Sequence, residues 1–241
     1  TEIVEESASF PSALPVKRDA HHAAWVTIQI GCDNSCAFCI VPSVRGKEIS
    51  RPYSELIGEV EQLAIAGVTE VTLLGQNVNS YGRDLTLKLR GTEVSAESSE
   101  LVGEAWVRGP HTARPLFSDL LCSVAEVSGI RRVRYTSPHP KDLRPETIDA
   151  MAQVPEVCEH LHLPLQSGSD KVLSAMHRGY TADRYIEKVD AARRQIPDLA
   201  LSTDIIVGFP GETDVDFERT LEVAAEVRFD NAYTFVYSPR P

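Results

Sequence analysis

The chain has 241 residues, of which 42% are hydrophobic and 24% charged, as in an ordinary soluble globular protein large enough for one α/β domain. It contains no run of about eighteen apolar residues, which excludes a predicted membrane span, and its acidic N-terminus does not resemble a signal peptide. The formal net charge is −11, from 24 basic and 35 acidic residues. This balance disfavours a surface built mainly to bind RNA, because RNA affinity depends largely on Lys and Arg.

The first part of the chain is predicted to be a linker followed by a strand. Residues 1–24 show no sustained apolar period, and the folded domain is expected to cover residues 25–241. Residues 25–30 alternate between apolar and polar and are rich in β-branched side chains, which predicts a strand. Pro52 stands at a plausible first position of a helix, and residues 68–74 have the pattern of the next strand.

Residues 84–114 differ from the rest of the chain. They are acidic and rich in Ser, and they show no core-forming period. We expect an insertion, either a β-hairpin or a mobile loop, with a short strand at 85–90. Trp106 is predicted to cover an apolar patch rather than to stack on a base.

After this insertion, strands and helices alternate again. Further strands are predicted at 131–136, 160–164, 201–207 and 231–237, and helices at 116–127, 145–151, 171–176 and 182–195. A capping box of Thr213 and Asp216 predicts the start of a last helix, with Phe217, Leu221 and Ala224 facing the core. Six strands alternating with helices imply parallel pairing. The predicted fold is therefore an open six-unit (β/α)6 barrel, with the chemistry at the carboxyl ends of its strands.

Three of the five cysteines, Cys32, Cys36 and Cys39, fall within eight residues and have the spacing C-x3-C-x2-C. Thiolates this close in sequence can hold one iron–sulfur or zinc centre. Zinc sites usually combine two separated ligand pairs, and a ferredoxin would add a fourth cysteine at a fixed distance. Cys122 and Cys158 stand alone. The spacing favours a three-cysteine [4Fe–4S] site whose fourth iron is left for a small molecule, and it indicates a reducing, cytoplasmic location.

The run C-x3-C-x-F-C resembles the signature of the radical S-adenosylmethionine (SAM) superfamily. Residues 31–52, with Arg-Gly at 45–46 and Ser-Arg-Pro at 50–52, resemble the methylthiotransferases of that superfamily. Residues 74–82 and 136–140 are similar to the tRNA branch of these enzymes, the MiaB-type methylthiotransferases. The resemblance covers nearly the whole chain, except for its first residues and residues 84–114.

This resemblance implies a radical SAM core with a [4Fe–4S] cluster held by Cys32, Cys36 and Cys39. SAM would bind the fourth iron and be cleaved reductively to methionine and a 5′-deoxyadenosyl radical. The implied reaction adds a methylthio group to C2 of a prenylated adenosine beside the anticodon of tRNA. Its expected partners are the tRNA and a reductant such as flavodoxin or ferredoxin, and the protein is expected to be monomeric.

The family normally carries two further domains. One is an N-terminal domain with a second, auxiliary [4Fe–4S] cluster, and the other is a small C-terminal β-barrel that binds RNA. We expect both in the full-length enzyme and neither in this chain, which would be the catalytic core alone. Such a core is expected to cleave SAM without thiolating tRNA.

The resemblance also implies contacts to SAM. Phe38 would pack with its ring and offer its backbone to the adenine, while Gln76 and Asn77 occupy the place where the superfamily holds the SAM amino group. Ser137 could reach SAM or the substrate. His139 and His162 are each possible proton donors, although a structural role is favoured for both.

Further along the chain, Gln166 and Ser167 follow the fourth strand, where ribose and carboxylate contacts usually lie. Arg178 is a candidate for pairing with the SAM carboxylate, because a guanidinium can bind a carboxylate through two hydrogen bonds. Asp204 lies in an apolar strand, so it is expected to face the barrel interior and meet a polar partner. Gly208 would permit close approach of the backbone to the adenine.

Three alternative functions stay open. Two are methylthiotransferases that act on threonylcarbamoyl-adenosine in tRNA or on an aspartate of a ribosomal protein, although residues 75–79 and 136–140 look unlike those branches. The third is a non-catalytic iron–sulfur or zinc-binding domain. Reductive cleavage of SAM would separate an enzyme from such a domain.

Overall fold

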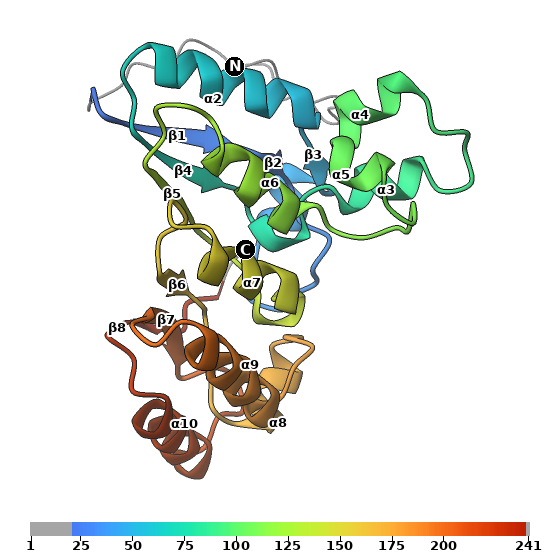
Figure 1. The fold of residues 1–241 in the computed structure, drawn as a ribbon. Helices are drawn as coiled ribbons and strands as arrows, with labels where there is room; N and C mark the ends of the chain where they lie inside the picture. Colours follow the sequence, from blue (N-terminus) through green and yellow to red (C-terminus); the bar gives the residue numbers. More distant parts are fainter. Residues whose placement is uncertain (1–20, 240–241) are drawn as a thin grey trace. The chain divides into compact units, whose positions relative to one another are not determined.

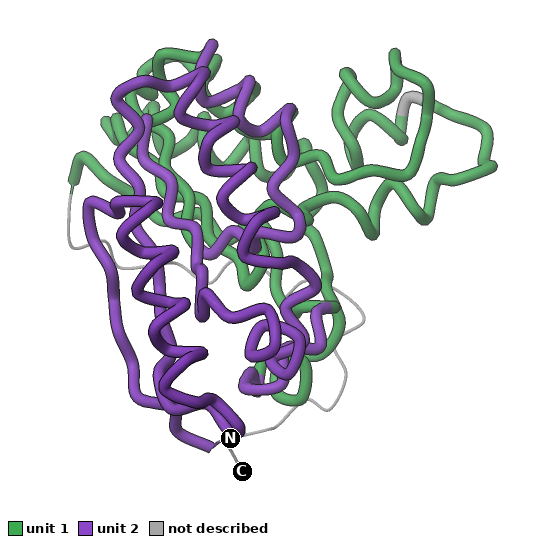
Figure 2. The backbone as a smooth tube through the Cα atoms, turned by 90° about the horizontal axis from the view of Figure 1, so that it is seen from below, with its two compact units in different colours: residues 1–33, 41–136, 154–158 green, residues 34–40, 137–153, 159–241 purple. Residues whose placement is uncertain are grey.

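The computed structural model describes residues 21–239. The chain divides into two compact units, one of residues 1–33, 41–136 and 154–158, the other of residues 34–40, 137–153 and 159–241 (Figure 2). Of the predicted linker, residues 1–20 lie outside the described residues. No helix of the described part is long and apolar enough to cross a membrane.

The first unit is built on a three-stranded parallel sheet (Figure 1). Strand β4 (Glu70–Leu74) lies in the middle and pairs with β1 (Ala23–Thr27) and β5 (Arg132–Tyr135). Val26 and Leu73 are fully buried in this sheet, as the alternation of apolar residues predicts. The strands predicted at 68–74 and 131–136 are therefore confirmed, while the one predicted at 25–30 starts earlier and ends at Thr27.

Two helices, α2 (Tyr53–Ile65) and α6 (Phe117–Ala125), contact each other and pack against β1 and β5 respectively. Pro52 is the residue that precedes α2 rather than its first helical residue, a difference of one position. The buried face of α2 has helical spacing and consists of Tyr53, Leu56, Val60 and Leu63.

A short antiparallel pair, β2 (Gln29–Ile30) and β3 (Ile49–Ser50), was not predicted. In the first unit, α1 (Val41–Arg45) precedes β3. Gly31 has φ +74°, and a Cβ placed there would lie 2.0 Å from the carbonyl oxygen of Lys47. Only glycine therefore lets the chain leave β2 so close to the strand that returns.

The insertion is helical, so the predicted β-hairpin or mobile loop and the short strand at 85–90 are wrong. Its helices are α3 (Arg83–Lys88), α4 (Ala96–Val102), which starts with a capping box, and α5 (Glu104–Val107). Trp106 is 1% exposed, and its Nε1–H donates to the carbonyl oxygen of Thr112 at 2.9 Å. Helix α4 packs against α2, so the insertion is folded onto the rest of the first unit. The predicted packing role of Trp106 is confirmed.

The second unit contains another three-stranded parallel sheet. Strand β7 (Ala200–Val207) lies between β6 (His160–His162) and β8 (Asn231–Val236). An isolated parallel bridge joins Gln166 to Ile205, beyond the end of β6. Strand β8 is the edge strand and is exposed along its whole length.

Four helices complete the second unit: α7 (Pro145–Gln153), α8 (Asp170–Ala175), α9 (Ala182–Gln195) and α10 (Asp214–Val227). Helix α9 contacts α7 and α10. The predicted capping box at Thr213 is present at the start of α10. Its core-facing residues differ from the prediction and are Asp216, Thr220, Val223 and Val227.

All six predicted strands are present, and they are parallel within each sheet. They form two three-stranded sheets, and the strands of residues 21–239 form no closed barrel. Before β6, Val157 bridges to Val133 of the first sheet, while β6 itself is only three residues long and pairs with β7. The fold is mixed α/β with parallel sheets.

Candidate functional site

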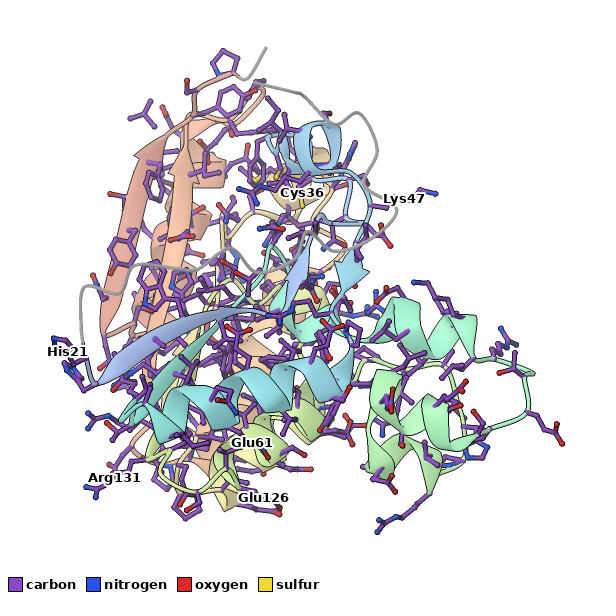
Figure 3. All side chains as sticks on the ribbon, turned by 90° about the horizontal axis from the view of Figure 1, so that it is seen from above. His21, Cys36, Lys47, Glu61, Glu126 and Arg131 are labelled. Carbon is purple, nitrogen blue, oxygen red and sulfur yellow. The ribbon has the colours of Figure 1, made fainter. Side chains whose placement is uncertain are left out.

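The three clustered cysteines are free thiols, divided between the units. In the first unit Cys32 is buried, and its N–H donates to the carbonyl oxygen of Gly46 at 3.2 Å. In the second unit Cys36 is half-buried and Cys39 is exposed, with the N–H of Cys39 donating to the carbonyl oxygen of Cys36 at 3.0 Å (Cys36 is labelled in Figure 3). Within residues 21–239 no three His, Cys, Asp or Glu side chains are grouped as a metal site, so the three-thiolate ligand set stays a prediction.

The loop that carries Cys36 is fixed to the turn after α8. The N–H of Ala37 donates to the carbonyl oxygen of Met176 at 3.0 Å. The ring Nδ1 of His177 lies 3.1 Å from the carbonyl oxygen of Ser35 and donates to it. These two hydrogen bonds flank Cys36 in sequence, so its backbone is held on both sides.

A buried arginine lies against the sulfur of Cys36. Arg178 is 5% exposed, and its Nη1 is 3.4 Å from Cys36 Sγ. Its Nε donates to the hydroxyl of Tyr180 at 3.1 Å and its Nη2 to the carbonyl oxygen of Pro164 at 3.5 Å. The guanidinium also lies 5.9 Å from the ring centre of Phe38. These hydrogen bonds use three of its five N–H groups, so the predicted pairing with a SAM carboxylate stays a prediction.

A buried histidine lies on the same sulfur. His139 is 7% exposed, its Nδ1 accepts a hydrogen bond from the N–H of Lys141 at 3.1 Å, and its Nε2 is 3.9 Å from Cys36 Sγ. Burial, and then the charge of Arg178, lower the pKa of His139 to about 3, so the ring is neutral at pH 7. Since Nδ1 is an acceptor, this assigns the proton to Nε2, the atom that faces the sulfur.

A cavity of about 320 Å³ in the second unit contacts three of the predicted site residues, Phe38, Gln166 and Asp204. Gln166 is 7% exposed, and its Oε1 has no hydrogen-bond partner among the described residues. Oδ2 of Asp204 lies 3.3 Å from Nε2 of His162, which is the polar partner expected for this carboxylate. The volume is in the range of small-molecule sites, and the side chains offer an aromatic ring, an amide and a carboxylate.

Other predicted site residues of the second unit have different surroundings. Ser167 is fully buried, with its Oγ 3.3 Å from Oγ1 of Thr220. Ser137 is exposed and has φ +58°. Gly208 is also exposed, has φ +79°, and donates its N–H to the carboxylate of Glu212. Their roles in SAM binding stay predictions.

Gln76 and Asn77 belong to the first unit. The carbonyl oxygen of Asn77 accepts hydrogen bonds from Nε2 of Gln29 at 2.8 Å and from the hydroxyl of Ser80 at 2.7 Å. Asn77 is 2% exposed, and Oε1 of the half-buried Gln76 has no partner among the described residues. The predicted contact with the SAM amino group stays a prediction for both.

Comparison with known proteins identifies the family. The family model described as "Radical SAM superfamily" matches residues 26–224. The chain belongs to the radical SAM superfamily.

Similar enzymes cover this radical SAM chain from end to end. It is 49% identical over 243 residues to the "tRNA-2-methylthio-N(6)-dimethylallyladenosine synthase" of Mycobacterium sp. (strain JLS), and 51% identical over 240 residues to "tRNA-2-methylthio-N(6)-dimethylallyladenosine synthase 1" of Mycobacterium marinum. Each match includes 100% of this chain, but 44% and 43% of the respective relative. The chain thus spans less than half the length of these curated relatives.

Solved radical SAM structures resemble this chain in fold alone. The methyltransferase TsrM from Kitasatospora setae is 15% identical, with a TM-score of 0.62 over 89% of this chain and 36% of that chain. The coproporphyrinogen III oxidase HemN from Escherichia coli is 16% identical, with a TM-score of 0.53 over 90% of this chain and 44% of that chain.

The sequence reasoning missed one buried acid of this radical SAM chain. Glu48 is 7% exposed, and its Oε2 lies 2.6 Å from the hydroxyl oxygen of Ser80. Its own N–H donates to Oδ1 of Asp33 at 3.1 Å, and burial raises the pKa of Glu48 to about 7. The one feature of the sequence that could have pointed to Glu48 is its position within residues 31–52, the run that resembles the methylthiotransferases.

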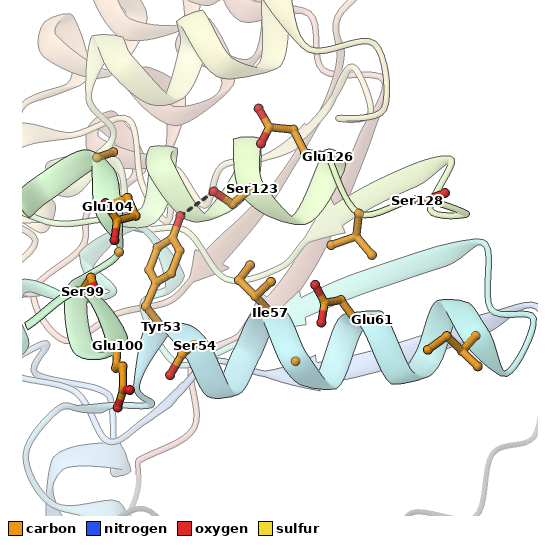
Figure 4. A pocket seen from close by; sticks show the side chains of 15 residues that line it. Tyr53, Ser54, Ile57, Glu61, Ser99, Glu100, Glu104, Ser123, Glu126 and Ser128 are labelled. Atoms are coloured by element: carbon orange, nitrogen blue, oxygen red, sulfur yellow. Dashed lines mark hydrogen bonds between the residues drawn. The ribbon is translucent and has the colours of Figure 1, made fainter. Parts of the chain in front are cut away.

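A second cavity, of about 780 Å³, lies in the first unit among α2, α4, α5 and α6 (Figure 4). Tyr53 lines it and donates its hydroxyl hydrogen to Oγ of Ser123 at 2.8 Å. Four of the lining side chains are acidic: Glu61, Glu100, Glu104 and Glu126. The cavity contains none of the predicted site residues, and its charge disfavours a phosphate ligand.

Proposed function

We propose that this chain is the radical SAM core of a methylthiotransferase that modifies C2 of a prenylated adenosine in tRNA. The observation that carries the proposal is the identity of about half, along the whole chain, with tRNA-2-methylthio-N(6)-dimethylallyladenosine synthases. The substrate is then tRNA, and a flavodoxin- or ferredoxin-like protein supplies electrons to a monomeric enzyme. The open six-unit barrel belongs to the same proposal, because six strands alternate with helices along the chain.

Cys32, Cys36 and Cys39 would hold a [4Fe–4S] cluster. The surroundings of Cys36 fit this role, since Arg178 and His139 both present N–H groups to its sulfur and a metal-bound thiolate carries negative charge. When bound and reduced, the cluster supplies the electron that cleaves SAM to methionine and a 5′-deoxyadenosyl radical.

Phe38, Gln166 and Asp204 would bind SAM from the walls of the smaller cavity. The unpartnered Oε1 of Gln166 can accept a hydrogen bond from a ribose hydroxyl or an amino group. Phe38 offers a ring face for an adenine, and Asp204 offers a charged acceptor. These residues hold the cofactor in one orientation, which is the main contribution a protein makes to such chemistry.

Anaerobic reconstitution of the chain with iron and sulfide tests the enzyme class. The expected product is a protein with about four iron atoms per chain that releases 5′-deoxyadenosine from SAM after reduction. Cys36→Ala should abolish this release. The matched control is Cys122→Ala, because Cys122 is a half-buried thiol outside the motif. A zinc-loaded chain that never cleaves SAM would overturn the proposal in favour of a non-catalytic metal domain.

The substrate is tested with the full-length protein that contains this chain. Mass spectrometry should detect a methylthio group on tRNA that carries the dimethylallyl-adenosine. Modification confined to threonylcarbamoyl-adenosine tRNA, or to an aspartate of a ribosomal protein, would reassign the enzyme to one of the other two branches.

A further inference from the structure

We propose that His139 and Arg178 are positioning residues that each donate an N–H hydrogen bond to the sulfur of Cys36 and thereby raise the reduction potential of the cluster held there. This inference rests on the proposed function, because it assumes that Cys36 ligates iron.

Two N–H groups converge on the sulfur of Cys36. Arg178 Nη1 and His139 Nε2 lie 3.4 and 3.9 Å from the same sulfur atom. They come from separate elements, one from the turn after α8 and the other from the start of the short helix η2 (Pro140–Asp142). Cys39, the other thiol of this unit, is exposed. The second unit therefore provides Cys36 with a built polar environment.

The His139 donor is held in place by the backbone around it. Nδ1 accepts the N–H of Lys141, so the ring proton that His139 can donate lies on Nε2. The turn that carries this N–H is fixed in turn by the ammonium group of Lys188, which donates to the carbonyl oxygens of Pro140, Lys141 and Leu143 at 2.6, 3.2 and 2.9 Å. The half-buried Lys188 thus donates hydrogen bonds to the backbone segment that positions His139.

Arg178 is fixed in a similar way. Its Nε donates to the hydroxyl of Tyr180, and that hydroxyl donates to the carbonyl oxygen of Leu165 at 2.9 Å. The guanidinium also lies 5.4 Å from the ring centre of Tyr180. Groups that hydrogen-bond to a metal's ligands orient those ligands and tune the metal.

The direction of the effect follows from charge. A reduced cluster carries one more negative charge than the oxidised cluster, and N–H donors and a buried cation stabilise the more negative state. Hydrogen bonds to the sulfurs are among the known controls on cluster potential. The two residues should therefore ease the reduction that starts the reaction, and Arg178 should have the larger effect because it adds a full positive charge.

The test measures the midpoint potential of the cluster in the reconstituted chain, by redox titration followed by electron paramagnetic resonance. His139→Leu and Arg178→Met should both lower the potential, while His139→Gln, which keeps an N–H at a similar reach, should stay closer to the unmodified chain. His22→Leu is the matched control, because His22 is exposed and its side chain plays no part in the proposed contacts. Unchanged potentials in both His139→Leu and Arg178→Met would overturn the inference.

A measurement on the unmodified chain covers the case in which these variants fail to fold. Chain labelled with ¹⁵N only at His or only at Arg, reduced without SAM, should show a weak ¹⁵N coupling to the cluster in pulsed electron paramagnetic resonance. Absence of both couplings would overturn the inference while leaving SAM cleavage, and with it the proposed function, intact. A chain that binds no iron–sulfur cluster would instead refute the proposed function itself.

Discussion

Each of the two units contains a buried polar cluster. The Glu48 cluster of the first unit consists of Gln29, Glu48, Asn77 and Ser80. The Cys36 cluster of the second unit consists of Cys36, His139, Arg178 and Tyr180. In the first, hydrogen bonds join the members to one another, and the N–H of Glu48 also donates to Asp33. In the second, two N–H donors point at a half-buried thiol that can also bind a metal.

The titratable groups of the two clusters show what burial does. It raises the pKa of Glu48 to about 7 and lowers the pKa of His139 to about 3, because a buried site disfavours the charged form of either group. The Glu48 carboxyl is neutral only below its pKa of about 7, and its Oε2 lies 2.6 Å from the hydroxyl of Ser80 inside the protein, which indicates a structural role. The imidazole of the second cluster directs its Nε2 at the sulfur of Cys36.

The largest expected difference between the two clusters is the effect of Glu48 on the pH dependence of the unfolding free energy. Ser80 and Arg83 favour its ionised form, Asp33 and Asp84 oppose it, and desolvation outweighs them all. The unfolded chain loses this proton near pH 4.5 and the folded chain near pH 7, so stability falls as the pH rises through this window. The difference amounts to about 3 kcal/mol, at about 1.36 kcal/mol per pH unit.

Glu48→Gln should therefore remove most of the fall in unfolding free energy between pH 5 and pH 8, as measured by urea unfolding at several pH values. Glu61→Gln is the control, because Glu61 is exposed on α2 and its loss should leave the pH profile as it is. If the pH profile of Glu48→Gln ran parallel to that of the unmodified chain, the Glu48 carboxyl would ionise near its ordinary pKa. Burial in the Glu48 cluster would then not disfavour its charged form.

An effect of intermediate size on SAM affinity should distinguish the two units. Gln166→Leu removes the amide that lines the smaller cavity and should weaken SAM binding to the cluster-loaded chain about tenfold, the equivalent of about 1.4 kcal/mol, which is typical of one lost hydrogen bond. Gln29→Leu removes a fully buried amide of the Glu48 cluster, so it should lower the unfolding free energy and leave the SAM dissociation constant unchanged. Equilibrium dialysis with labelled SAM measures the SAM dissociation constant of both variants. Equal losses of affinity would contradict the assignment of the smaller cavity as the SAM site.

Much of the fold, and the cysteine motif, could be predicted from the sequence. The strands alternate in hydrophobicity, and the three cysteines lie close together along the chain. The contacts to Cys36 could not be predicted, since His139 and Arg178 lie 103 and 142 residues away from it. The insertion was misjudged because its helices are short and show no long apolar period. These helices have six, seven and four residues, which are too few for periodicity to separate a helix from a loop.

The buried face of α10 shows a further limit. Hydropathy placed Leu221 in the core, yet it is 53% exposed. The polar Asp216 and Thr220 are buried instead, because Asp216 accepts a hydrogen bond from the hydroxyl of Ser169 at 2.6 Å and Thr220 from the N–H of Gly168 at 2.9 Å. Paired polar groups of this kind cannot be seen in one helix alone, since each partner lies in another element.

The smallest predicted effect concerns Ser167, the neighbour of Gln166. Its hydroxyl is fully buried, accepts a hydrogen bond from the N–H of Ser169 at 3.2 Å and lies 3.3 Å from Oγ1 of Thr220. Ser167→Ala should therefore lower the unfolding free energy by about 1 kcal/mol and leave SAM affinity within about twofold of the unmodified chain. If Ser167→Ala weakened SAM binding as strongly as Gln166→Leu, Ser167 would contact SAM directly. Both residues of the 166–167 turn would then belong to the SAM site. If affinity is kept, Gln166 faces the cofactor while Ser167, one residue along the chain, fixes the turn from behind.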